Sequence, residues 1–212
     1  MKEQSKEYYK ERSEKMTGKK QLKNKGFTLV EMMIVVSILA ILLGILIPSF
    51  NALVDYRATR AAKSISSGLE RMRTEAMSRL VAEMKLEKKS DGYYISYCLH
   101  KGKQAGMVWS NEEKIAPART NITYRLATKE SVELKTGESI ILTVDRSTKG
   151  FRPLQSAAVT TEEVNALIDN NEDIAYHDID GAQCYTITVS GTIKKRIISL
   201  NQTTGKCTVT SG

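Results

Sequence analysis

The sequence has few of the residues that catalytic and metal sites use. Its 212 residues include only two histidines, His100 and His177. Neither lies in a metal-ligand spacing or near a recognisable serine or cysteine nucleophile motif. It also has no glycine-rich loop of the kind that cradles phosphate. We therefore expect no catalytic residue, no metal site and no cofactor.

An acidic segment offers the main argument against that expectation. The run Asp178-Ile179-Asp180-Gly181 follows Glu172 and Asp173 closely, and it is as rich in oxygen ligands as a calcium loop. It lacks the full spacing of such a loop, so an ordinary acidic turn is the favoured interpretation.

A long apolar segment dominates the N-terminal part of the chain. Residues 27–47 contain a single charged side chain, Glu31. As a helix, this segment would span roughly the 30 Å hydrocarbon core of a bilayer. A carboxylate inside such a span is costly and requires a partner or a function. No signal-peptidase site of the A-x-A kind stands out after Ile47, so the segment is expected to remain in the protein.

The start of this segment resembles a known processing site. Gly26-Phe27-Thr28-Leu29-Val30-Glu31 is similar to the cleavage site of type IV pilins and secretion pseudopilins. In that family a membrane peptidase cuts after the glycine, the new N-terminal phenylalanine is methylated, and a glutamate is the fifth mature residue. The resemblance, which covers about 25 residues, implies cleavage between Gly26 and Phe27, N-methylation of Phe27 and an assembly role for Glu31. Pro48 stands where family members carry a helix-breaking proline.

Elementary electrostatics agrees with this resemblance. Cleavage would create a cationic amine on Phe27, and the carboxylate of Glu31 would be its counter-charge. The two residues share a helix face, and between subunits the same attraction could set the register of assembly. The alternative is an ordinary membrane anchor in which Glu31 reaches the headgroups.

Residues 1–26 are expected to be a leader that is removed. They carry nine Lys/Arg against four Glu, a net charge of +5, so the +8 of the precursor falls to +3 on cleavage. This subtraction weakens any argument for nucleic-acid binding from overall charge. The cations before the span place this end in the cytoplasm and the C-terminal part outside. Translation from Met16 instead of Met1 would give a shorter leader.

The apolar periodicity continues beyond Pro48 and predicts an amphipathic helix to about Lys85, within a segment 48–88. Its apolar stripe recurs every three or four residues and comprises Leu53, Ala61, Ile65, Leu69, Met72, Ala76, Leu80 and Met84. Basic residues largely fill the other faces. Acidic residues interleave them and few aromatics accompany them, so a solvated face is favoured over a DNA-binding one.

The remainder, residues 89–212, predicts one β-rich head with a single core and no internal repeat. The expected strands are Tyr93–Leu99, Ile122–Ala127, Ser139–Val144, Cys184–Val189, Ile193–Leu200 and Cys207–Thr210. Turns at Ser190-Gly191 and Thr204-Gly205-Lys206 would make the last three a β-meander. Thr160 to Glu163 predicts the start of a short helix.

A second, shorter resemblance concerns residues 68–79. Their R-x-E-A-x-x-R pattern is similar to the helix end of H-type minor pseudopilins and FimT-like minor pilins, which are thought to prime or cap the fibre.

Three cysteines would lie in an oxidising compartment if the head is outside the cell. Cys184 and Cys207 flank the terminal hairpins, much as the C-terminal disulfide loop of a pilin does. A bridge between them would close about 22 residues and leave Cys98 as a small buried side chain. Other pairings and three reduced thiols remain alternatives.

The sequence therefore indicates an α+β, pilin-like fold: a long N-terminal helix, part transmembrane and part amphipathic, packed on a C-terminal antiparallel β-rich head. The resemblance implies a subunit of a pilus or of a secretion or competence pseudopilus. Its partners would be the prepilin peptidase and methylase, other subunits and the inner-membrane assembly platform. The alternatives are a tethered binding domain that never polymerises and a DNA-binding minor pilin.

Overall fold

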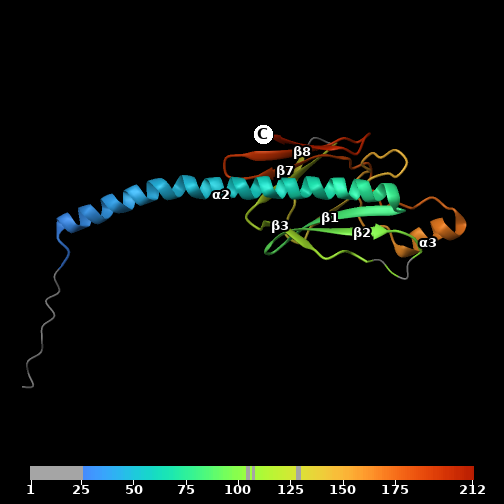
Figure 1. Cartoon of the computed structure of the whole chain (residues 1–212), viewed down its shortest axis with the longest axis horizontal. Helices are drawn as coiled ribbons and strands as arrows, with labels where there is room; N and C mark the ends of the chain where they lie inside the picture. The colour runs from blue at the N-terminus through green and yellow to red at the C-terminus, as the bar shows by residue number, and fades with distance from the viewer. Residues whose placement is uncertain (1–25, 104–105, 107, 128–129) are drawn as a thin grey trace, which may run out of the picture. The chain divides into compact units, whose positions relative to one another are not determined.

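The computed structural model of the chain describes residues 26–103, 106, 108–127 and 130–212 (Figure 1). The predicted leader, apart from Gly26, and the alternative start at Met16 lie outside these residues. Two compact units divide the chain at residues 45 and 46. Helix α2, Leu29–Ser78, begins in the first unit and ends in the second. Its backbone stays helical through Pro48, so the proline does not end the helix, as expected.

In the first unit, the helix is apolar on every side. The large apolar side chains between Phe27 and Leu46 are 46–78 % exposed. A helix apolar all round belongs in a protein interior or a membrane. Among the described residues, α2 is the helix that is long and apolar enough to cross a bilayer.

In the second unit, α2 packs against the head through a stripe of small and aliphatic residues. The buried members recur at three- and four-residue intervals: Ala58, Ala61, Ala62, Ile65, Leu69, Met72 and Ala76. They include most of the predicted stripe, but Leu53 is 44 % exposed. A Cβ added at Gly68 would lie 2.8 Å from the Tyr97 hydroxyl, so this glycine allows a close approach of helix and sheet.

The prediction that the helix continues to about Lys85 is wrong. The helix ends at Ser78, and strand β1, Val81–Lys89, follows directly. Met84 and Leu86 both face the core, and their spacing of two residues is the period of a strand. Met84 also fits the three- and four-residue spacing of the predicted helical stripe, whereas Leu86 does not belong to that stripe.

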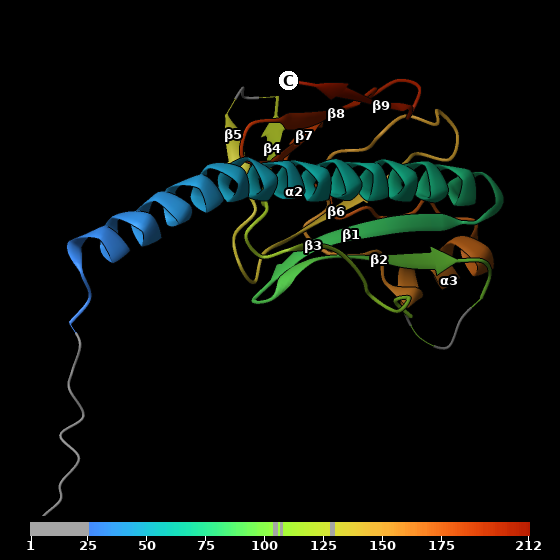
Figure 2. The same cartoon turned by 60° about the vertical axis from the view of Figure 1, so that its left-hand side comes forward.

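The first sheet has the strand order β3-β2-β1-β6, all antiparallel. Its other strands are β2 (Gly92–His100), β3 (Glu113–Pro117) and β6 (Ser139–Thr143). Strands β2 and β6 confirm predictions, whereas β1 and β3 were not foreseen. Figure 2 shows α2 lying across this sheet and the second one.

The second sheet has the order β5-β4-β7-β8-β9 and is also antiparallel. Its strands are β4 (Asn121–Leu126), β5 (Ser131–Glu133), β7 (Cys184–Ser190), β8 (Lys195–Leu200) and β9 (Cys207–Ser211). The predicted C-terminal meander is confirmed, with β8 beginning two residues later than expected. Strand β5 was not foreseen.

The predicted short helix is confirmed as α3, Thr161–Asn170. The Thr160 side chain accepts a hydrogen bond from the Glu163 backbone N, and the Thr160 backbone N donates to the Glu163 carboxylate at 2.7 Å. This reciprocal pair is a capping box. Asn171 ends the helix in the left-handed conformation, with φ of 54°.

The predicted Cys184–Cys207 bridge is not formed, because all three cysteines are free thiols. Cys184 lies on β7 and Cys207 on β9, and β8 runs between them. Two strand spacings separate the backbones of the two cysteines by about 9–10 Å in the direction across the sheet. A disulfide tolerates Cα atoms no more than about 7 Å apart. Proximity in the meander therefore does not bring the two cysteines within bonding range.

Candidate functional site

The helix start at Thr28 is built as a second capping box. The Thr28 backbone N and Oγ1 donate hydrogen bonds to Glu31 Oε2 at 2.9 and 3.0 Å, and the Glu31 backbone N donates to Thr28 Oγ1 at 3.2 Å. The T-x-x-E spacing that predicted the start of α3 also occurs here. Thr28 is thus a site residue that the sequence analysis missed, although its signal was present.

The predicted processing residues lie together at this exposed helix start. Gly26 precedes the helix, and a Cβ built on it would meet nothing within 4 Å. Phe27 is 78 % exposed. The peptide bond between them is therefore open to an enzyme. In the uncut chain Phe27 has no terminal amine, and the hydrogen bonds to the Glu31 carboxylate come from Thr28 instead.

The polar side chain of Ser37, inside the apolar segment, is satisfied internally. Its Oγ donates to the carbonyl oxygen of Met33 one turn earlier, at 2.7 Å. Such back-bonding lets a hydroxyl enter a bilayer without an unpaired donor. From Thr28 to Ser37 the polar groups thus make local hydrogen bonds, while the apolar side chains face outward.

The basic face of the second half of α2 is compensated by acidic neighbours. Arg73 lies 3.5 Å from Glu70, and Arg79 pairs with Glu75. The acidic segment near residue 178 is also engaged by protein groups, since the Arg152 guanidinium donates to Asp178 at 2.9 Å. These contacts fit a solvated helix face and an acidic turn.

The first sheet brings together three side chains that the sequence analysis had not connected. The ligand atoms of Glu83, Cys98 and His100 all lie within 4.8 Å of one another, and all three residues are buried. Burial raises the pKa of Glu83 to about 7 and that of the Cys98 thiol to about 12. Linear spacing could not reveal this cluster, because Glu83 was assigned to a helix and Cys98 to a strand that was expected to end at Leu99, before His100.

Comparison with known proteins bears on the N-terminal segment. Residues 21–47 match the family described as the prokaryotic N-terminal methylation motif. No significant match to a curated protein or to a solved structure is found. The matched residues contain Gly26, Phe27, Glu31 and the exposed apolar part of α2.

The motif and the apolar helix together support a membrane-anchored, type IV pilin-like protein that is processed by prepilin peptidase and assembles with other pilins. The family that carries this motif is structural and not enzymatic. Residues 21–47 thus carry the prokaryotic N-terminal methylation motif, and this match supports a type IV pilin-like protein.

Proposed function

We propose that the chain is a minor subunit of a type IV pilus or of a type II secretion or competence pseudopilus. It is cut between Gly26 and Phe27, methylated on Phe27, and assembled through the first half of α2. The observation that carries this proposal is the exposed, predominantly apolar first half of α2 joined to the methylation motif. Such a surface must be covered by lipid before assembly and by neighbouring subunits after it.

The topology of the precursor follows from charge. The nine cations of residues 1–26 hold the N-terminus in the cytoplasm, and the head lies on the outer side of the membrane. The inner-membrane assembly platform then transfers the processed helix from lipid into the filament, and the head faces outward.

The minor role is supported by the end of α2. Arg73, Glu75, Ala76 and Arg79 form the pattern of the minor subgroup, and they close the helix immediately before β1. The ion pair between Arg79 and Glu75 fixes the last turn. A subunit of this kind would prime the fibre or occupy its tip.

The N-terminus of the mature protein tests this proposal. Mass spectrometry of the chain recovered from its own cells should find N-methyl-phenylalanine 27 at the N-terminus. Gly26→Val should block cleavage and leave the full precursor in the membrane. Gly44→Val is the matched control, because this glycine also has open space around it but lies inside the apolar segment.

Two outcomes would contradict the proposal. Mature protein that retains residues 1–26 would indicate a tethered binding domain that never polymerises, and that domain would also tolerate Gly26→Val. A processed chain that binds duplex DNA with a marked salt dependence would indicate the DNA-uptake alternative instead.

A further inference from the structure

We propose that Glu83, Cys98 and His100 form a binding site for a zinc ion in the head. This site is independent of the proposed role in a filament. Nothing in the motif at residues 21–47 accounts for it.

Strand pairing places the three side chains on one face of the first sheet. Glu83 on β1 is paired directly with Cys98 on β2, and His100 follows Cys98 by two residues. Side chains two residues apart on a strand share a face. The neighbouring Met84 points the other way, toward Gly68 on α2. The cluster therefore lies on the face of the sheet that α2 does not cover.

The distances suit a tetrahedral ion. Cys98 Sγ and His100 Nε2 are 3.3 Å apart. In a tetrahedral zinc site, a Zn–S bond of about 2.3 Å and a Zn–N bond of about 2.0 Å place these two ligand atoms roughly 3.5 Å apart. The distances between the ligand atoms of Glu83, Cys98 and His100 are all at most 4.8 Å. A small change of the Glu83 rotamer would therefore bring its carboxylate into contact with the same ion.

The chemistry of the ligands selects the class of metal. A thiolate and an imidazole favour zinc and similar transition metals, whereas calcium and magnesium require oxygen ligands. A thiolate and a carboxylate together balance the charge of one divalent cation. Three protein ligands leave the fourth tetrahedral position for a water molecule.

Backbone N–H groups donate hydrogen bonds to two of the proposed ligands, Glu83 and Cys98. The Val159 backbone N donates to Glu83 Oε1 and Oε2 at 3.0 and 3.3 Å, and the Val108 backbone donates to the Cys98 sulfur. Such outer hydrogen bonds orient ligands in metal sites. Val159 itself is fully buried beside Val81 and Val164, so an apolar shell covers this side of the cluster.

A divalent cation would also suit the charges of the cluster. Glu83 and Cys98 are buried next to each other as a directly paired position of β1 and β2. A divalent ion stabilises a coordinating thiolate outright, so it would balance both groups in this buried position. Coordination would also protect Cys98 from oxidation outside the cytoplasm.

Metal content and cobalt spectroscopy of the full chain in detergent test the proposal. Protein purified without chelator should contain one zinc per chain. Replacement with Co²⁺ should give the near-ultraviolet charge-transfer band of a thiolate ligand. Cys98→Ala should abolish this band and weaken zinc binding by at least about 100-fold. Cys184→Ala is the matched control: that cysteine is also buried on a strand but lies in the other sheet, so both signals should persist.

Two further variants exclude a folding artefact. Glu83→Gln and His100→Asn preserve approximate size, and their circular dichroism should match that of the parent chain while zinc affinity falls. The proposal is overturned if the parent chain binds no zinc, if Cys98→Ala keeps the cobalt–thiolate band, or if Cys184→Ala loses it. Zinc bound with equal affinity by all four variants would mark an adventitious ion only.

Discussion

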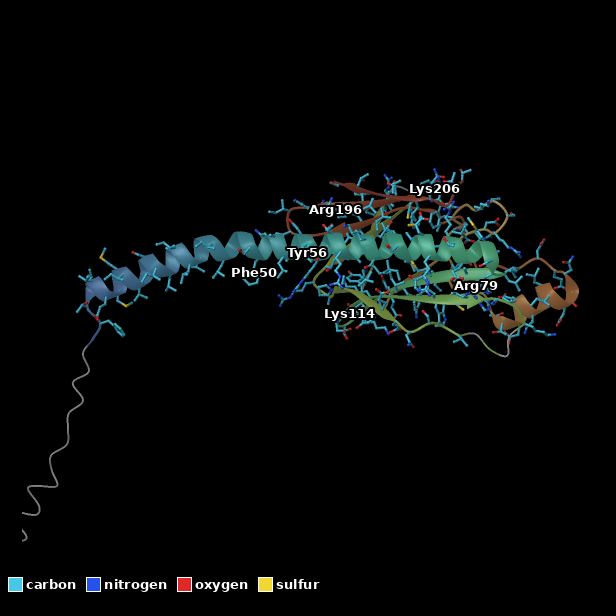
Figure 3. The ribbon with its side chains drawn as sticks, in the orientation of Figure 1. Phe50, Tyr56, Arg79, Lys114, Arg196 and Lys206 are labelled. Atoms are coloured by element: carbon cyan, nitrogen blue, oxygen red, sulfur yellow. The ribbon has the colours of Figure 1, made fainter. Side chains whose placement is uncertain are left out.

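Asp55 on α2 is hydrogen-bonded to the backbone of Thr192 in the β7–β8 turn, with 2.9 Å between Oδ1 and the amide nitrogen. The same oxygen accepts from the backbone N of Ile193 at 3.1 Å and of Lys194 at 3.2 Å. Gly191 permits this approach, since a Cβ there would lie 2.3 Å from Asp55 Oδ1. One carboxylate thus ties the helix to the second sheet. Figure 3 labels Tyr56 on this helix and Arg196 on β8 of that sheet.

Loss of this carboxylate should loosen the contact between helix and head. Desolvation opposes ionisation of Asp55, but the three backbone N–H donors outweigh it and hold the pKa below its usual value. Asp55→Ala leaves three backbone donors without their acceptor, and we expect Tm to fall by more than about 3 °C. Thermal unfolding of the full chain in detergent measures this. Asp180→Ala, at an exposed position, should leave Tm unchanged, and equal shifts for both variants would contradict the assignment.

The Asp145 loop predicts a pH-dependent part of head stability. Hydrogen bonds from the Ser147 hydroxyl and the Thr148 backbone lower the pKa of Asp145 to about 2, against partial burial that raises it. The carboxylate therefore contributes stability that is present above its unfolded pKa near 4 and is lost as pH falls toward 2. After allowance for solvent screening, this contribution is about 1–2 kcal/mol.

Asp145→Asn isolates this contribution. The variant should be less stable than the parent at pH 7, and the difference should shrink as pH falls from 5 to 3. Urea unfolding at several pH values measures it. A difference that stays constant with pH would show that the loop depends on shape and not on charge.

The sequence predicted those elements whose local signals were unambiguous. The capping box at Thr160 located α3, and period-two patterns located β2, β4, β6 and the C-terminal meander. The prediction failed at β1, because Met84 fits both a helical and a strand period. The helix pattern that precedes Met84 was therefore extended too far. Strands β3 and β5 are short, with only Ile115 and Ala116 of β3 buried and no buried residue in β5, so their apolar pattern is weak.

The two sites differ in how far sequence can reveal them. Gly26, Phe27 and Glu31 are contiguous, and their order alone carries the signal. The cluster at Glu83 depends on the pairing register of β1 with β2, which brings residues 15 and 17 positions apart onto one face. Register is set by the whole core, so linear spacing carries no trace of it.

Gly205 should be among the least replaceable residues of the meander. Its φ is +62°, and a Cβ there would lie 2.0 Å from the carbonyl oxygen of Lys149. Gly205→Ala combines backbone strain with a backbone clash and should cost more than about 2 kcal/mol of unfolding free energy. Gly137→Ala is the matched control, because Gly137 also has a positive φ but open space around it, so its cost should be nearer 1 kcal/mol. Denaturant unfolding measures the loss of unfolding free energy in both variants. Equal losses would show that the clash with the Lys149 carbonyl oxygen does not contribute.

Thiol counting should find three free cysteines in the denatured chain, with or without reductant. Strand β8 separates Cys184 from Cys207, and no cysteine has a bonded partner. In the native chain, Cys207 should react with an alkylating reagent first, because Cys98 and Cys184 are buried. One thiol without reductant and three with it would establish a bridge and require rearrangement of the meander.

Glu31 caps the helix in the structure, and the resemblance predicts a second role in assembly; conservative substitutions should separate the two. Its capping bond to Thr28 needs an acceptor, which glutamine also supplies, whereas attraction to a processed Phe27 amine needs a negative charge. We expect Glu31→Gln to keep the helix start but to impair assembly about as strongly as Glu31→Ala does. Thr28→Ala removes the cap while keeping the charge, so filament assembly should remain near normal.

Membrane fractionation and recovery of assembled filaments measure the two roles in the same cells. All three variants should insert into the membrane, because the apolar side chains from Leu29 onward are unchanged. If Thr28→Ala abolishes assembly while Glu31→Gln supports it, then Glu31 acts by capping the helix. The carboxylate would then have no part in the contact between subunits, and register in the filament would have to come from the packing of apolar side chains.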